Sequence, residues 1–139
     1  MPTIDPIALL TEVLESYGHT NVNSGRIDST ALASPEYVFL EEVGGSTPHI
    51  DRSDRPTVQI VVYAMDETGG DGYELSRAKS YQIQSDLRDA WGKPFSNGGI
   101  HRVITRLRPQ RQDIPGIPYG VGRTVAQYDF VFTNSEKWV

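Results

Sequence analysis

At 139 residues the chain is long enough to bury a hydrophobic core without staples, and we expect one domain over residues 1–139. The absence of cysteine excludes disulfides and thiolate metal sites and fits synthesis in a reducing compartment. Hydrophobic residues make up 37% of the chain, but no apolar run approaches the ~20 residues that span a bilayer, and no secretory signal is visible. A net charge of −5 also argues against a dedicated nucleic-acid-binding protein.

The first predicted element is a helix over residues 5–17. Asp5 suits the N-cap, and Pro6 suits the first helical position, where its missing N–H costs nothing. Apolar residues follow at helical spacing, and Gly18 supplies a left-handed stop. This stripe consists of Ile7, Leu10, Val13, Leu14 and Tyr17. Residues 19–33 are expected to form an irregular connection.

The middle of the chain predicts two strands, at residues 36–43 and 57–64. The second strand is almost continuously apolar, which indicates a central strand covered on both faces or nearly so. A polar loop over residues 44–55 joins the two strands, and an acidic, glycine-rich turn follows at residues 66–72.

A second helix is predicted over residues 73–91, closed by Gly92 and Pro94. Its apolar side is formed by Leu75, Ile83, Leu87, Ala90 and Trp91, with Ser76 and Ser80 as small residues on the same stripe. Two more strands are predicted at residues 100–108 and 123–133. The last strand alternates with a period of two and places its aromatic residues on one face. That face carries Ala126, Tyr128, Phe130 and Phe132.

This order of elements, αββαββ, predicts an α+β fold. Two amphipathic helices would pack on one face of a mostly antiparallel four-stranded sheet. The three arginines of the 100–108 strand share a parity, so on a regular strand they project from one face. The face away from the helices would therefore carry Arg102, Arg106 and Arg108, together with Gln127 and Asp129.

No set of residues predicts a catalytic, cofactor or metal site. The three histidines stand apart from one another, and the chain lacks the Gly-x-Ser-x-Gly turn that exposes a nucleophile. The turn at residues 66–72 carries three carboxylates but lacks the alternation and terminal glutamate of a calcium loop. The segment Gly120-Val121-Gly122-Arg123 matches no phosphate-binding fingerprint and leads into a strand.

The charge is divided unevenly along the chain. Residues 1–75 contain thirteen acids and three bases, and residues 76–139 contain five acids and ten bases, giving −10 and +5. Five of the ten arginines lie between residues 102 and 123, where Asp113 is the only acid. The loop at residues 109–122 is rich in proline and glycine and too apolar to lie free in water, so we expect it to contact another molecule.

Three interpretations of the arginines remain open at this point. They bind phosphate, they form a solvated face paired with carboxylates such as Asp129, or they meet the acidic half of a neighbouring subunit. In the third interpretation the acidic loops at residues 41–54 and 66–71 oppose them. The candidate interface residues are Arg102, Arg106, Arg108, Arg111, Ile114, Ile117, Tyr119 and Arg123.

The chain resembles the tail terminator proteins of long-tailed bacteriophages, also known as minor tail or tail completion proteins. The resemblance rests on the helix at residues 5–17, the strand at residues 56–64 and the helix that ends Leu87-Arg88-Asp89-Ala90-Trp91. It is most evident where Pro115-Gly116-Ile117-Pro118 leads into the strand at residues 122–132. The loop at residues 44–55 has no counterpart that we can match to the family.

The resemblance implies a non-enzymatic virion protein without cofactors, located at the head-proximal end of the tail and in the host cytoplasm during assembly. Such proteins form a ring, commonly of six subunits, that caps the tail tube and ends its polymerisation. The ring provides the surface for head-tail joining, so the partners would be the tail tube protein and the connector protein. Genomic DNA would pass through the bore without sequence-specific binding, and no membrane is involved.

Other functions remain as alternatives. The nearest is a head-closure or adaptor protein of the head-tail connector, which also assembles into a ring. A small enzyme or a small nucleic-acid-binding module is more distant, because the titratable residues are scattered along the sequence. Measurable self-association with little affinity for free DNA separates ring assembly from DNA binding.

Overall fold

A computed structural model describes residues 4–24, 36–46, 53–66, 70, 72–113, 115 and 120–133, apart from the side chains of residues 45, 46, 53 and 54. Among these residues neither helix is both long and apolar enough to cross a membrane. In chain order the elements are α1 (Pro6–Ser16), β1 (Val22–Ser24), β2 (Glu36–Ser46), β3 (Ser53–Met65), α3 (Tyr73–Asp89), β4 (Pro94–Phe95), β5 (Gly98–Arg111) and β6 (Val121–Thr133).

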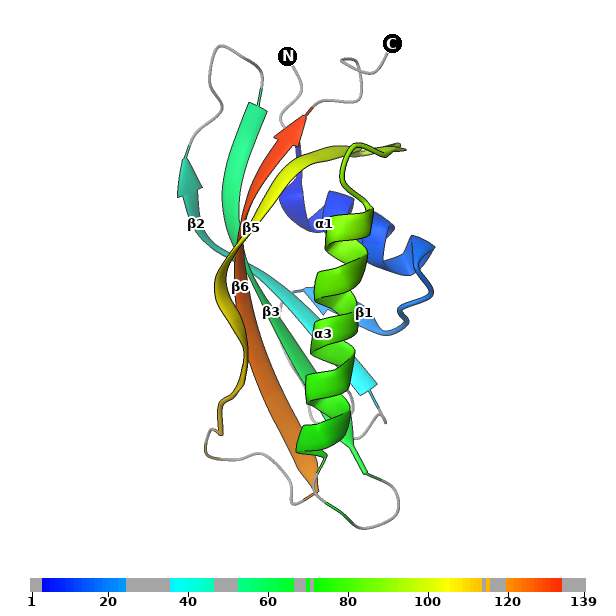
Figure 1. The fold of residues 1–139 in the computed structure, drawn as a ribbon, viewed down its shortest axis with the longest axis vertical. Coiled ribbons are helices and arrows are strands. Elements are labelled where there is room, and N and C mark those ends of the chain that lie inside the picture. The colour runs from blue at the N-terminus through cyan, green and yellow to red at the C-terminus, as the bar shows by residue number, and fades with distance from the viewer. Residues whose placement is uncertain are drawn as a thin grey trace.

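The strands form one curled sheet in the order β1-β2-β3-β6-β5-β4, and Figure 1 shows α1 and α3 together on one side of it. β1 is parallel to β2, and every other described pair is antiparallel. The α+β class and the helix layer are as predicted, but four strands was wrong. The described sheet has six, because β1 and β4 add strands of three and two residues at its margins. Strands so short carry no periodicity that a sequence pattern can reveal.

α1 forms where the capping residues predict it. The Asp5 carboxylate accepts hydrogen bonds from the backbone N–H groups of Ile7 (3.0 Å) and Ala8 (3.2 Å), which satisfies two donors that the first turn leaves unpaired. The helix ends before Gly18, whose φ of +88° is the left-handed conformation predicted for it. The bounds differ from the prediction by one residue at each end.

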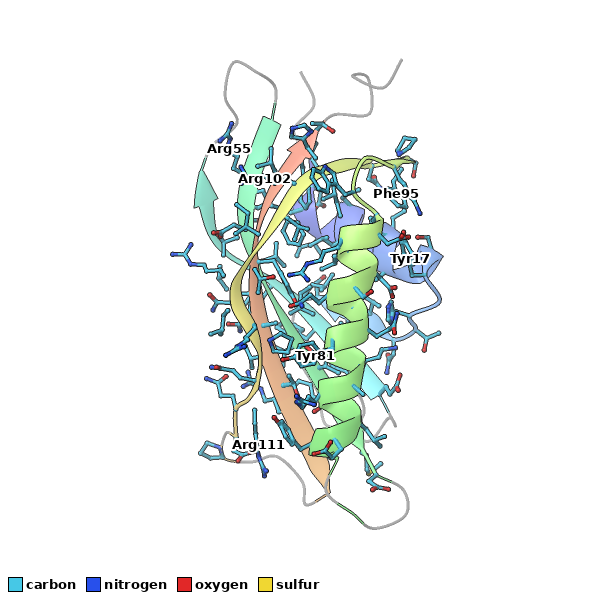
Figure 2. The ribbon with its side chains drawn as sticks, in the orientation of Figure 1. Tyr17, Arg55, Tyr81, Phe95, Arg102 and Arg111 are labelled. Carbon is cyan, nitrogen blue, oxygen red and sulfur yellow. The ribbon has the colours of Figure 1, made fainter. Side chains whose placement is uncertain are left out.

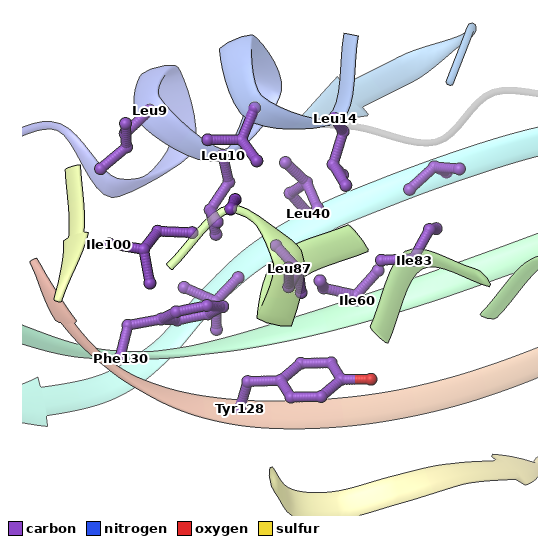
Figure 3. Close-up of a cluster of buried hydrophobic side chains, with 14 of the residues drawn as sticks. Leu9, Leu10, Leu14, Leu40, Ile60, Ile83, Leu87, Ile100, Tyr128 and Phe130 are labelled. Carbon is purple, nitrogen blue, oxygen red and sulfur yellow. The ribbon is translucent and has the colours of Figure 1, made fainter. Parts of the chain in front are cut away.

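The main hydrophobic core lies between the helices and the sheet (Figure 3). Side chains from both helices meet the aromatic face of β6, which faces the helices as predicted. The largest fully buried side chains are those of Leu9, Leu10, Val13, Leu14, Leu40, Ile60, Ile83, Leu87, Ile100, Tyr128, Phe130 and Phe132. Stacking of Phe130 on Phe132, with ring centroids 5.0 Å apart, adds to the burial.

Two residues predicted on the apolar side of α3 are instead exposed. Leu75 lies in the first turn of the helix and is 47% exposed. Trp91 is 63% exposed, because the helix ends at Asp89 and the helical period no longer sets the direction of the Trp91 side chain.

A second cluster lies on the opposite face of the sheet. Tyr37, Val61, Tyr63 and Val125 are buried there, and Phe39, Leu107 and Val121 pack against them. β3 therefore contributes alternate side chains to both clusters, which confirms the prediction of a central strand covered on both faces.

α3 begins in direct contact with the sheet. The N–H of Gly72 donates to the carbonyl of Gly120 (3.1 Å), and a Cβ at Gly72 would lie 2.0 Å from the carbonyl oxygen of Ala64. A Cβ at Gly122 would lie 2.2 Å from the backbone nitrogen of Tyr73. Only glycine fits at either position, so these two residues set how closely α3 approaches β6.

The connections are shorter than predicted. β2 reaches Ser46 and β3 begins at Ser53, so the predicted loop at residues 44–55 is mostly strand where it is described. The loop at residues 109–122 is shortened likewise, because Gln110 and Arg111 pair with β6. Pro109 is accommodated beside a register shift, where a missing N–H costs little. The predicted connection at residues 19–33 contains β1 up to Ser24, and its remainder lies outside the described residues.

Candidate assembly surface

β5 carries four of the candidate interface arginines on an irregular strand. Its pairing with β6 shifts register between Ile100 and Arg102, between Thr105 and Leu107, and between Leu107 and Gln110. Each shift inserts one extra residue into β5, so odd-numbered residues before and after a shift point to opposite faces of the sheet.

Val103 and Leu107 demonstrate this change. Both have odd numbers, yet Val103 packs in the main core on the helix side and Leu107 packs in the second cluster on the other side. Shared parity therefore does not by itself fix the faces of Arg102, Arg106 and Arg108.

Two of these arginines are placed by their contacts. Arg102 lies opposite Val131. Because Val131 alternates along β6 with Phe130 and Phe132, which face the helices, Arg102 projects away from the helices. The Arg106 guanidinium lies 3.3 Å from the Asp129 carboxylate, which also accepts a hydrogen bond from the Thr57 hydroxyl (2.6 Å). The Arg106–Asp129 pair is 60% and 39% exposed, so it adds only ~0.2–1 kcal/mol to stability and leaves Arg106 available to a partner.

Arg111 and Arg123 occupy different surroundings. Figure 2 shows Arg111 at the opposite end of β5 from Arg102. The Arg111 guanidinium lies 5.2 Å from the ring centre of Tyr73 and bonds Asp113 through Nε. Arg123 is half-buried over the second cluster, where its Nε donates to the Tyr63 hydroxyl (3.1 Å). Arg123 therefore stabilises the fold itself.

The remaining candidates, Ile114, Ile117 and Tyr119, lie outside the described residues. So do residues 67–69 and 71 of the acidic turn at residues 66–71, and residues 47–52 of the acidic loop at residues 41–54. What the structure does describe of the acidic side is the end of β2, where Glu41 and Glu42 are exposed.

Two exposed apolar residues escaped the sequence analysis. Ile104 lies among the arginines of β5, and Val43 follows the two glutamates of β2; each is 44% exposed. In the sequence each is an apolar residue inside a charged segment. Only the register of the sheet shows that the side chain is exposed.

A buried polar cluster joins the two helices. The Nε2 atom of His19 lies 2.6 Å from Oδ2 of Asp86, and the Gln82 amide donates to Oδ1 of the same carboxylate (3.0 Å). His19 and Asp86 are 5% and 8% exposed. The contact spans 67 residues of sequence, so no local spacing predicted it. It fastens the end of α1 to α3.

Glu12 fastens α1 to the turn between β4 and β5. Its carboxylate accepts hydrogen bonds from the backbone N–H groups of Ser96 and Asn97 (3.0 Å each) and from both of their side chains. Partial burial raises the pKa of Glu12, but these four donors together outweigh it and hold the pKa below its usual value. A shallow, open depression beside α1 includes Glu12, but the Glu12 carboxylate already accepts these hydrogen bonds from Ser96 and Asn97.

A third contact lies at the exposed ends of the helices. The Tyr17 hydroxyl donates to Asp89 (2.6 Å), and the Lys93 ammonium donates to Asp89 (2.9 Å) and to Tyr17 (3.2 Å). Burial and the bond to Asp89 raise the pKa of Tyr17, while the bonds from Tyr17 and Lys93 lower the pKa of Asp89. These polar contacts hold the helix layer together.

The geometry therefore defines an α+β protein whose distinctive surfaces are its charged outer strands. Among the described buried side chains, only the Thr133 hydroxyl lacks a hydrogen-bond partner. Within the described residues, no three His, Cys, Asp or Glu residues gather into a group that could hold a metal ion.

The sequence matches no protein-family model and no curated protein. In structure the chain is similar to a chain of the virion of a native gene transfer agent particle, with a TM-score of 0.54 and 13% sequence identity. The similarity covers 91% of this chain and 90% of the other, so the two share one fold over nearly their whole lengths.

Proposed function

We propose that this chain is a non-enzymatic virion assembly protein: a tail terminator that forms a ring, commonly of six subunits, on the end of a phage tail tube. The observation that carries the proposal is the fold shared with a chain of a gene transfer agent virion, which extends over nine tenths of both chains. The sequence resemblance to tail terminators supports the same class independently.

The surface chemistry suits this function. A ring built from head-to-tail contacts needs two different surfaces that complement each other. The exposed arginines of β5 and the exposed glutamates of β2 supply such a pair on one chain. The whole chain would act as one domain, at the head-proximal end of the tail, between the tube protein and the connector protein.

A ring on the tube leaves a bore through which genomic DNA passes without sequence-specific contacts. The nearest competing function, a head-closure or adaptor ring, would bind the connector and leave tube polymerisation unaffected.

The first experiment measures self-association and its effect on tubes. We expect light scattering behind size exclusion, from low to high concentration, to detect a closed ring, visible by negative stain. Added to polymerising tube protein of the same particle, the chain should shorten the tubes. A chain that stays monomeric alone and on tubes would refute ring assembly, and rings that leave tube length unchanged would favour the adaptor function.

Charge reversal tests the arginines. We expect Arg106→Glu combined with Arg108→Glu to abolish rings while the monomer stays folded, because both side chains are exposed. The matched control is Arg77→Glu combined with Arg88→Glu, which makes the same charge change on exposed positions of α3. Ring formation by the β5 variant equal to that of the control would refute the arginine interface.

A further inference from the structure

The sheet has two long free edges, one on β2 and one on β5, where no described strand pairs; we call them the β2 margin and the β5 margin. β1 pairs with β2 only from Val38 to Leu40, so among the described residues no strand covers β2 from Glu41 to Ser46. On the other side, β4 pairs with Gly98 and Gly99, and Trp91 bridges to Ile100. Within the same described part of the chain, β5 has no outer partner beyond Ile100. Open margins present unpaired backbone N–H and C=O groups to any matching strand.

These two margins carry opposite charges. The β2 margin holds Glu41 and Glu42, and the β5 margin holds Arg102, Arg106 and Arg108. Among the described residues, Arg102, Arg108 and the two glutamates have no ion-pair partner. Two β5 margins would repel each other, as would two β2 margins, so charge permits only the unlike pair.

Each margin also exposes one large apolar side chain, Val43 on β2 and Ile104 on β5. Burying both against each other would favour association by the hydrophobic effect. The complementarity therefore extends to apolar contact as well as charge.

We propose that the β5 margin of one copy pairs with the β2 margin of the next, so that one continuous sheet runs around the ring. The inference rests on the proposed function for self-assembly and adds to it the identity of the contact. The strand order supports it: β2, β3, β6 and β5 alternate in direction, so β2 and β5 run oppositely. A neighbour generated by rotation about an axis along the strands then presents β2 antiparallel to β5.

The apolar residues suggest the register of this pairing. With Val43 beside Ile104 in an antiparallel pair, Glu41 of one copy lies opposite Arg106 of the other. Ile104 lies within residues 102–105 of β5, where pairing with β6 shows no register shift, whereas Val43 and Arg106 each stand at a shift. Residues directly opposite in an antiparallel pair have Cα atoms about 4.5–5.5 Å apart, and a disulfide spans Cα separations of about 4.4–6.8 Å.

Engineered cysteines test this contact without background, because the chain contains no cysteine. We expect the variant carrying Val43→Cys and Ile104→Cys, oxidised at high concentration alone and on tail tubes, to give a ladder of covalent multimers. Either single variant should stop at the dimer. The matched control pairs Val43→Cys with Leu75→Cys, since Leu75 is 47% exposed but lies on α3.

Each outcome of the cross-linking experiment supports or overturns the margin contact. A ladder that closes at the ring size supports both the margin contact and the ring. Rings in micrographs without the 43–104 link overturn the contact and leave the proposed function standing, whereas linked open chains support the contact and contradict the ring. A ladder no stronger than that of the control pair, or no association in either condition, overturns the contact.

A charge swap provides an independent readout. Glu41→Arg should reduce the linked multimers of the cysteine variant at least about tenfold, because it places like charges opposite each other. Adding Arg106→Glu should restore the ladder. If Arg106→Glu fails to restore the linked multimers that Glu41→Arg removes, the proposed register is contradicted.

Discussion

The Glu12 carboxylate offers the sharpest test of how the helix layer is fastened to the sheet. Glu12→Gln keeps the shape of the side chain but turns one acceptor end into a donor, which then faces the N–H group of Ser96 or Asn97. Two backbone bonds are weakened, each worth about 0.5–1 kcal/mol at a partly exposed site, so we expect a loss of about 1–2 kcal/mol at pH 7.

The dependence on pH identifies the carboxylate as the cause. The pKa of Glu12 is lowered in the folded protein, so its contribution is complete above the unfolded pKa of a glutamate, about 4.3, and is lost as the pH falls through the folded pKa. The difference between the wild-type chain and Glu12→Gln should therefore narrow below about pH 4. Asp89, whose pKa is also lowered, loses its contribution in both proteins and cancels from the difference.

Urea denaturation at a series of pH values measures this difference directly. Glu15→Gln is the matched control, because it removes the same charge from an exposed position on the same helix, and it should change the free energy of unfolding by less than about 0.5 kcal/mol. A difference for Glu12→Gln that stays constant from neutral to acidic pH would refute the assigned role of the carboxylate.

Two substitutions test the packing of α3 on the sheet. Gly122→Ala should cost at least about 3 kcal/mol or prevent folding, because its Cβ would lie 2.2 Å from backbone, whereas Gly44→Ala should cost little, since its nearest neighbour is Thr57 Cβ at 3.9 Å. Thermal denaturation compares the two, and equal losses would contradict the close approach. Asp86→Ala should cost about 2–3 kcal/mol in urea denaturation by leaving His19 and Gln82 without their acceptor, and Asp86→Asn should cost less because it retains one acceptor oxygen. Equal costs for the two Asp86 variants would contradict the hydrogen-bond account.

The parts of the fold that the sequence predicted depend on local chemistry. Asp5, Pro6 and Gly18 act within a turn of their own positions, and the alternation on β6 needs only neighbouring residues, so both were predicted closely. The register shifts of β5 depend on pairing with β6, and the His19–Asp86 contact depends on the packing of α1 against α3. Neither leaves a local pattern, which is why parity alone could not place all the arginines of β5 and the buried pair was missed.

The candidate assembly surface was likewise predicted only in the part that local sequence determines. The sequence identified the basic segment and the opposite charge of the two halves, but it counted Arg123 and Arg111 equally with the other interface candidates. The structure separates them, because Arg123 is half-buried and bonds Tyr63, and Arg111, although exposed, lies over Tyr73 and bonds Asp113. What remains on the open margin is Arg102, Arg106 and Arg108, and their acidic counterpart is the end of β2.

This separation bears on how a ring would close. Charges that already bond within the subunit would have to break those bonds to meet a neighbour, whereas Arg102 and Arg108 have no such bonds within the described residues. A margin contact between two copies buries few residues and is weak alone, but every subunit of a closed ring makes it twice. Assembly would then be favoured where many copies meet at one place, which is the situation at the end of a tail tube.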